Sequence, residues 1–250
     1  MFAGPATSAI LAESPSAAIG TLARRRGSGT RSTIAILVLL LGARVKLTVV
    51  TLVTRPGNLP AIADSINAAL VDGFGQPIPG LDVRWLVLFD QAKLPAPELV
   101  VLPAQSPDTT EGYCVEVLDG QCGEPFLRNK ALDLVDVGHH IAWCDDDNLV
   151  EPDFFLAVAA QLAEQPGAVL VFDQVLADGT HRLTASPDNM RFGSVDTAQV
   201  VAPREVYGAH RFDNVANGTD GFMYERLWQS HGTRFKFVNE PRVKYNALHR

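Results

Sequence analysis

The sequence has few of the features that mark specialised classes of protein. Basic residues are in the minority, because 21 Lys and Arg face 28 Asp and Glu and leave a net charge of −7 at pH 7. A nucleic-acid-binding surface would be basic, so this balance argues against nucleic acid as a partner. Cysteine is also scarce, with three residues and no CxxC pair. At least one thiol must therefore stay unpaired, which favours a reducing, cytoplasmic location.

Long apolar segments are scarce as well. The apolar run at residues 33–41 follows three consecutive arginines and is too short to cross a bilayer as a helix. Basic residues before a short apolar stretch do resemble a signal-peptide core. We expect residues 1–44 to form a poorly ordered extension, with peripheral membrane association through this segment as the alternative. Residues 45–250 are then long enough for one α/β domain.

Strand and helix patterns alternate after residue 44. Strands are predicted at residues 45–53, 83–89, 140–144, 168–176, 200–202 and 235–238. Helices are predicted to begin near Pro60, Pro125, Pro152 and Asp220. We find no internal repeat. This alternation favours an α/β fold with an open, mostly parallel sheet that is covered by helices on both faces.

The predicted strand at residues 140–144 ends in an acidic turn, Asp145-Asp146-Asp147-Asn148. Consecutive carboxylates repel one another and do not extend a strand. They are typical of the carboxyl end of a strand, where open α/β sheets bind ligands. Asp145 and Asp147 are alternate residues and point the same way. A hard divalent cation would offset their repulsion and could bridge them to a diphosphate.

Three other interpretations of this turn can be weighed from the residues. A solvated acidic turn is one of them. A calcium loop would need Gly at its sixth position, where Val150 stands. A phosphatase of the haloacid-dehalogenase type would use Asp145 as nucleophile and Asp147 as acid/base, but that family has a small β-branched residue where Leu149 stands. Its later Lys and second acidic pair cannot be placed convincingly.

The order of these features resembles nucleotide-sugar glycosyltransferases of the GT-A fold. The acidic turn looks like their DxD motif, and residues 128–132, RNKAL, are similar to the RNxAL run of the family 43 glucuronyltransferases. Residues 49–55, VVTLVTR, resemble the first strand of family 2. The resemblance covers residues 45–250 as a single domain. It implies a glycosyltransferase that uses Mn²⁺ or Mg²⁺ and a nucleoside-diphosphate sugar, above all a UDP-sugar, with a carbohydrate or other hydroxyl acceptor. A non-catalytic nucleotide-sugar-binding relative is an alternative.

The resemblance also implies residues for the nucleotide of the donor. Thr51, Thr54 and Arg55 would hold the base and ribose at the end of the first strand. Asp90, at the end of the second strand, would hydrogen-bond the base, or else cap a turn. Arg128 would bind the diphosphate as a bidentate donor, with an ordinary surface position on a helix as the alternative.

Further roles follow from the same resemblance for the acidic turn and the end of the chain. Asp145 would bind ribose, and Asp146 would belong to the donor nucleotide site. Asp147 would bind the metal ion, and His249 resembles a late histidine that contacts metal or diphosphate. His249 is one residue from the chain end, where fraying is common.

Two more carboxylates are candidates for the sugar and the chemistry. Asp196 could accept hydrogen bonds from a sugar hydroxyl, or could simply serve a turn. Asp220 resembles the catalytic base, although family 43 usually has Glu there and Asp is also a good helix N-cap. Glu225, one helical turn later, is the substitute. Families 2 and 43 invert the anomeric centre, so the resemblance implies inversion.

Overall fold

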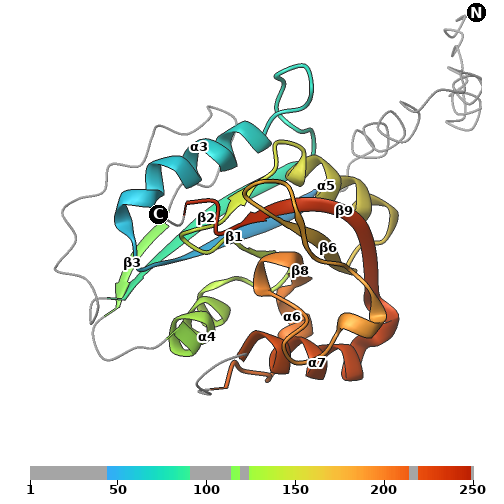
Figure 1. The fold of residues 1–250 in the computed structure, drawn as a ribbon. Helices are drawn as coiled ribbons and strands as arrows, with labels where there is room; N and C mark the ends of the chain where they lie inside the picture. The colour runs from blue at the N-terminus through green and yellow to red at the C-terminus, as the bar shows by residue number, and fades with distance from the viewer. Residues whose placement is uncertain (1–43, 91–113, 119–123, 214–218, 249–250) are drawn as a thin grey trace, which may run out of the picture.

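A nine-stranded sheet runs through the part of the chain that the computed structural model describes, which is residues 44–90, 114–118, 124–213 and 219–248 (Figure 1). The strand order is β3-β2-β1-β4-β8-β6-β9-β5, and β7 pairs with β6 off this path. Most of the predicted N-terminal extension therefore lies outside the described residues. Within them, no helix is both long and apolar enough to cross a membrane.

One half of the sheet is parallel. Strand β1 (Val45–Val53) pairs in parallel with β2 (Leu81–Asp90) on one side and with β4 (His140–Trp143) on the other. Strand β3 (Cys114–Leu118) extends this half beside β2. The predicted strands at residues 45–53, 83–89 and 140–144 are confirmed, with boundaries that differ by two residues or fewer.

The other half makes the sheet mixed, so the expectation of a mostly parallel sheet is wrong. Strand β8 (Val200–Pro203) is antiparallel to both β4 and β6 (Val169–Leu176), and β7 (His181–Leu183) is antiparallel to β6. Parallel neighbours need a long crossover, usually a helix, whereas β6 and β7 are joined by four residues. The tight connection between β6 and β7 carries no such crossover.

Strand β9 (Phe235–Tyr245) bends along the sheet and returns to the acidic turn. It runs parallel to β6, but the register shifts beside Asp173, which pairs with Pro241. Proline cannot donate to a strand ladder, so the pairing is interrupted there. Beyond this point, β9 also pairs with the two-residue strand β5 (Leu149–Val150), which directly follows the acidic turn.

Helices cover both faces of the sheet (Figure 1). On one face lie α3 (Leu59–Ala69) and α5 (Phe154–Glu164). On the other lie α4 (Glu124–Leu134), the short α6 (Arg204–Tyr207) and α7 (Thr219–His231). Single-turn helices η1 to η4 occupy Pro56–Asn58, Pro187–Asn189, Thr197–Gln199 and Gly232–Arg234.

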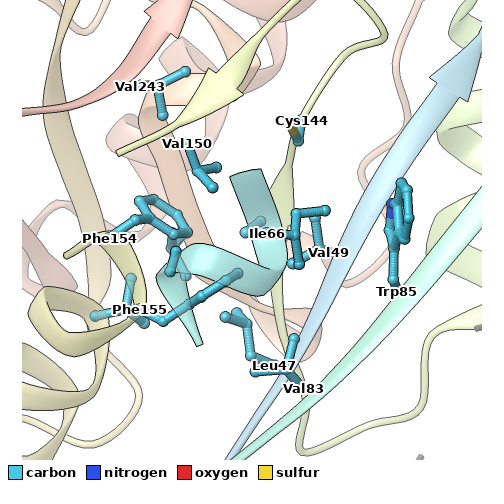
Figure 2. Close-up of a cluster of buried hydrophobic side chains, with 14 of the residues drawn as sticks. Leu47, Val49, Ile66, Val83, Trp85, Cys144, Val150, Phe154, Phe155 and Val243 are labelled. Atoms are coloured by element: carbon cyan, nitrogen blue, oxygen red, sulfur yellow. The ribbon is translucent and has the colours of Figure 1, made fainter. Parts of the chain in front are cut away.

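The core has two parts, one on each face of the sheet. Alternate residues of β1 divide between them: Leu47 and Val49 face α3 and α5, whereas Val50 and Leu52 face α4 and α7. Figure 2 shows the first part, where Val49 lies beside Ile66 of α3. Because β1 is buried on both faces, eight of its nine residues are buried and six are apolar, without a regular alternation of apolar and exposed positions. This central strand fixes the position of the loop that follows it.

Candidate functional site

The acidic turn lies at the carboxyl edge of the sheet. Strands β1 and β4 are parallel neighbours, so the segments that follow them leave the sheet at the same edge. The backbone N–H of Cys144 donates to the carbonyl of Val50 at 2.9 Å and continues this pairing up to the turn. The Thr54-Arg55 segment after β1 therefore lies beside the acidic turn after β4.

Asp146 ties these two loops together. Its carboxylate accepts hydrogen bonds from the backbone N–H and the hydroxyl of Thr54, from the backbone N–H of Arg55 at 2.5 Å, and from Nη1 of Arg55 at 2.9 Å. The backbone carbonyl of Asp146 accepts from Asn58 Nδ2 at 2.8 Å. The side chain is buried, and its oxygens are occupied by the neighbouring loop. Sequence reasoning did not select Asn58, because an amide before a helix is an ordinary cap.

Arg55 also reaches the next carboxylate of the turn. Its Nη1 lies 2.9 Å from Asp147 Oδ2 as well as 2.9 Å from Asp146 Oδ1. The Arg55 side chain is 43% exposed, whereas that of Asp147 is 15% exposed. A cation of the protein thus partly neutralises the turn, as the repulsion between its carboxylates requires.

The end of the described chain packs onto the same turn. The backbone N–H of Asn246 donates to Asn148 Oδ1 at 3.0 Å, and that of Leu248 donates to the carbonyl of Asp147 at 3.0 Å. These bonds follow from the return of β9 along β5. His249, the predicted metal ligand, is the next residue and lies outside the described ranges.

Next to the turn, Arg128 of α4 is the centre of a buried charge cluster, called the hub below, with the carboxylates of Glu124, Asp145 and Asp220. Its guanidinium group lies over the rings of Trp143 and Phe212, at 5.2 and 5.7 Å from their centroids. Its Nη2 donates to Asp145 Oδ2 at 3.2 Å and to the carboxylate of Glu124. Only 1% of the Arg128 side chain is exposed. Sequence reasoning missed Glu124, although its i,i+4 spacing from Arg128 was a usable signal.

The same hub reaches Asp220, the second residue of α7. Asp220 Oδ1 lies 3.6 Å from Arg128 Nε, and its Oδ2 accepts from the Thr197 hydroxyl at 3.4 Å. The side chains of Asp220 and Asp145 keep 21% and 28% exposure, so a ligand can reach both. Two carboxylates 75 positions apart in the sequence thus share one arginine.

Burial dominates the electrostatics of this hub. It raises the pKa of Asp145 to about 7, although the nearby Arg128 charge pulls that pKa down. It also raises the pKa of Asp220, again against the opposing effect of Arg128. Burial alone would lower the pKa of Arg128, but three surrounding carboxylates, including Glu124, raise it well above its usual value. The arginine therefore stays charged.

Asp196 is near this group but has structural partners. Its Oδ1 accepts from the backbone N–H of Ala198 at 2.9 Å, and it begins η3 in a capping box with Gln199. Its Oδ2 accepts from Arg182 Nη1 at 3.0 Å. The charge of Asp196 contributes to the raised pKa of both Asp145 and Asp220. The predicted contact of Asp196 with a sugar would compete with the capping bonds and with Arg182.

Two other residues predicted to bind the nucleotide, Thr51 and Asp90, are not seen at the charged site around the acidic turn. Thr51 is fully buried, and its hydroxyl accepts from Trp85 Nε1 at 2.9 Å, so it faces the core and not the edge of the sheet. Asp90 ends β2 at the correct edge, but its side chain lies outside what the structure describes. Glu225, the substitute base, accepts from the backbone N–H of Phe192 at 3.4 Å.

The acidic turn offers one carboxylate, that of Asp147, that suits a hard divalent cation. Among the described residues, no three His, Cys, Asp or Glu side chains are grouped so that they could hold a metal ion. Mg²⁺, however, often binds through one or two carboxylates while phosphate and water supply the remaining ligands. Asp147 is a partly exposed carboxylate that already has a cationic neighbour in Arg55, so it fits the role of a single protein ligand.

Comparison with known proteins relates this fold to S. aureus TarS. The structure of TarS residues 1–349 matches with a TM-score of 0.57 over 80% of this chain, at 13% sequence identity. TarS complexes with UDP-GlcNAc and with UDP match with TM-scores of 0.55 and 0.56, at 14% and 13% identity. The chain spans about 60% of the length of these TarS fragments and 36% of a longer TarS chain.

Sequence comparison adds no closer relationship. No protein-family model and no curated protein matches the sequence. The structural likeness supports the predicted glycosyltransferase fold and gives no particular support to family 43. At this identity it concerns the fold and not the activity.

Proposed function

We propose that this protein is a glycosyltransferase that transfers a sugar from a nucleoside-diphosphate sugar, most simply a UDP-sugar, to an acceptor hydroxyl. One observation carries the proposal: Asp145 from the end of β4 and Asp220 from the start of α7 meet at the buried Arg128. They do so at the sheet edge where Arg55 and Asp147 also lie. The likeness of the fold to TarS, which has been crystallised with UDP-GlcNAc and with UDP, supports the class of donor.

In this proposal, Asp220 is the general base. Its carboxylate would take the proton of the acceptor hydroxyl as that oxygen attacks the anomeric carbon and the bond to the diphosphate breaks. Direct displacement of this kind inverts the anomeric centre. Arg128 keeps Asp220 in place and favours its ionised form, which is the form that can accept a proton. Burial opposes this and brings the pKa of Asp220 closer to that of a useful base at neutral pH.

Asp145 and Asp147 have separate roles. Asp145 is held by Arg128 and is open enough to accept a hydrogen bond from a ribose hydroxyl. Asp147 would hold Mn²⁺ or Mg²⁺, and the bound ion would neutralise charge on the departing diphosphate. Asp146 differs from both because its carboxylate is occupied by the loop after β1.

The test is to incubate the protein with a panel of nucleotide sugars, with Mn²⁺ and with a chelator, and to measure donor binding and hydrolysis. Binding and turnover of at least one donor support the proposal. If no donor binds or reacts in either condition, the proposal fails. Tight nucleotide binding without turnover would favour a non-catalytic relative, and hydrolysis of a generic aryl phosphate would favour the phosphatase alternative.

A further inference from the structure

The two arginines near the acidic turn have opposite settings. Arg128 is sealed in the core, with Nε and Nη2 facing Glu124, Asp145 and Asp220. Its Nη1 is buried as well and has no hydrogen-bond partner in the described part of the chain. To reach a ligand, Arg128 would have to leave the carboxylates that compensate its charge, which is costly for a buried ion. This setting suits a support beneath the site better than a ligand-binding group.

Arg55 is anchored and exposed at the same time. Both of its ion pairs, with Asp146 and with Asp147, use a single nitrogen, Nη1. The side chain keeps 43% exposure. The backbone N–H of Arg55 donates to the same Asp146 carboxylate at 2.5 Å, so both ends of the residue are fixed by one partner. Within the described ranges, Nε and Nη2 of Arg55 make no hydrogen bond or ion pair, so this edge of the guanidinium group can face a ligand in a defined direction.

We propose that Arg55 is the arginine that binds the diphosphate of the donor, and that Asp146 is the positioning residue that holds Arg55 for this contact. The inference rests on the proposed function and assigns the phosphate contact within it. A planar guanidinium group pairs well with phosphate oxygens. Holding it in advance reduces the entropy that is lost on binding. The proposal thus moves the diphosphate contact from Arg128, for which it was expected, to Arg55, which was expected to hold the base and ribose.

A ligand series separates these roles. We would measure binding of uridine, UMP and UDP by calorimetry in the presence of EDTA, so that the protein alone supplies the phosphate contacts. For Arg55→Gln we expect UDP affinity to fall by roughly 10- to 100-fold, the value of lost charge-assisted hydrogen bonds. Uridine affinity should change by less than about 2-fold, because uridine has no phosphate. Arg128→Lys should not reproduce this selective loss.

The role of Asp146 is tested by a double-mutant cycle. Asp146→Asn should weaken UDP more than uridine, because it places an N–H donor against the donors of Thr54 and Arg55. In an Arg55→Gln background the same change should add little to the loss of UDP affinity, which a purely structural role would not predict. If Asp146→Asn does not fold, Thr54→Ala removes only the 2.8 Å hydroxyl contact and should give a smaller loss of the same kind.

Arg211→Gln is the matched control. Arg211 is 41% exposed and is paired with Asp133 at 3.0 Å, so it resembles Arg55 in exposure and pairing. Its removal should leave the affinities for all three ligands unchanged.

Three outcomes would overturn the inference. Equal losses of uridine and UDP affinity in Arg55→Gln would return Arg55 to the nucleoside. A selective loss of UDP affinity in Arg128→Lys but not in Arg55→Gln would return the diphosphate to Arg128. If UDP binds the unmodified protein only with Mn²⁺, the same series is measured with Mn²⁺. If none of the three ligands binds the unmodified protein with EDTA or with Mn²⁺, the proposed function itself fails and the inference falls with it. That result differs from the other two outcomes, in which the unmodified protein binds UDP.

Discussion

At the scale of single residues, the surroundings of Asp220 combine two opposing effects. Burial disfavours its charge, while Arg128 at 3.6 Å favours it. Thr197 fixes the other oxygen through its hydroxyl. A carboxylate that is held in place but only partly satisfied retains basicity, which is what a catalytic base needs.

Replacing Asp220 with Asn is the direct test of this role. Asn keeps the size of the side chain and can still accept from the Thr197 hydroxyl, but it cannot take a proton. We expect the affinity for nucleotide to change little and transfer to the acceptor to fall by roughly 10²–10⁴-fold. Calorimetry and initial rates measure the two effects. Glu225→Gln is the control, and a near-normal rate in Asp220→Asn would move the role to Glu225 or Asp196.

The pH dependence of transfer provides a second test of the same residue. Burial raises the pKa of Asp220, so this base becomes protonated at a higher pH than an exposed Asp, for which the usual value is about 3.9. Only the ionised form accepts a proton, so kcat/KM should fall as pH is lowered through the raised pKa. A profile from about pH 4 to pH 9 would show this midpoint. A midpoint at or below the ordinary value for Asp would contradict the assignment.

Asp147 offers a test of the metal. Asp147→Asn removes an anionic ligand, and we expect turnover to fall by orders of magnitude while the protein stays folded. The lost ion pair with Arg55 is partly exposed and contributes about 1 kcal/mol or less, so the melting temperature should change by only a few degrees. Binding of Mn²⁺ should weaken in parallel. Undiminished, metal-dependent turnover in this variant would refute the role.

At the scale of elements, the start of α7 depends on a close backbone contact. A Cβ atom added to Gly221 would lie 2.7 Å from the Cα of Phe192 and 2.8 Å from the N of Gly193, and backbone atoms cannot easily move aside. The rings of Phe192 and Phe222 stack beside this contact, with centroids 4.5 Å apart. Gly221 thus allows α7 to pack closely against the loop that leads into η3. Thr197, the first residue of η3, donates a hydrogen bond to Asp220.

Gly221→Ala should therefore destabilise the protein. The overlap requires a backbone shift that costs about 1–3 kcal/mol, or a decrease in melting temperature of roughly 2–10 °C. Transfer should also fall, because Asp220 is the preceding residue. Gly73→Ala is the matched control, since an added Cβ there has no neighbour within 4 Å. Equal melting temperatures for the two variants would show that the contact at Gly221 relaxes freely.

At the scale of the whole molecule, both faces of the sheet are already covered by helices from the described ranges. The two parts of the core, one against α3 and α5 and one against α4 and α7, fill both sides of β1. A domain that buries its central strand in this way has a sufficient core of its own. The predicted division of the chain near residue 44 can be tested on this basis.

Deleting residues 1–40 should leave the domain folded. We expect the melting temperature to change by less than about 2 °C, which corresponds to about 1 kcal/mol or less for a domain of this size. Thermal unfolding of the full and shortened chains, with circular dichroism at 25 °C as the check of fold, measures the difference. A large decrease would mean that residues 33–41 belong to the core.

Local patterns in the sequence determined most of the elements and the location of the site. The β-branched run of β1, the prolines near the starts of α3, α4 and α5, and the acidic turn after β4 each act through neighbouring residues. Such signals can be read from one segment at a time. The two-residue strand β5 and the hairpin strand β7 were missed because segments this short carry no periodicity.

Only the tertiary structure decided which charges meet. Asp146 is occupied by the loop after β1 because the parallel strands β1 and β4 bring their carboxyl ends to one edge. Asp220 reaches the arginine of Asp145 from another element, the start of α7. The tertiary structure also gives the two arginines different exposure: Arg55 lies at the surface and Arg128 is buried. Sequence spacing cannot report burial or contacts between distant segments, since both arise when the sheet and its helices pack together.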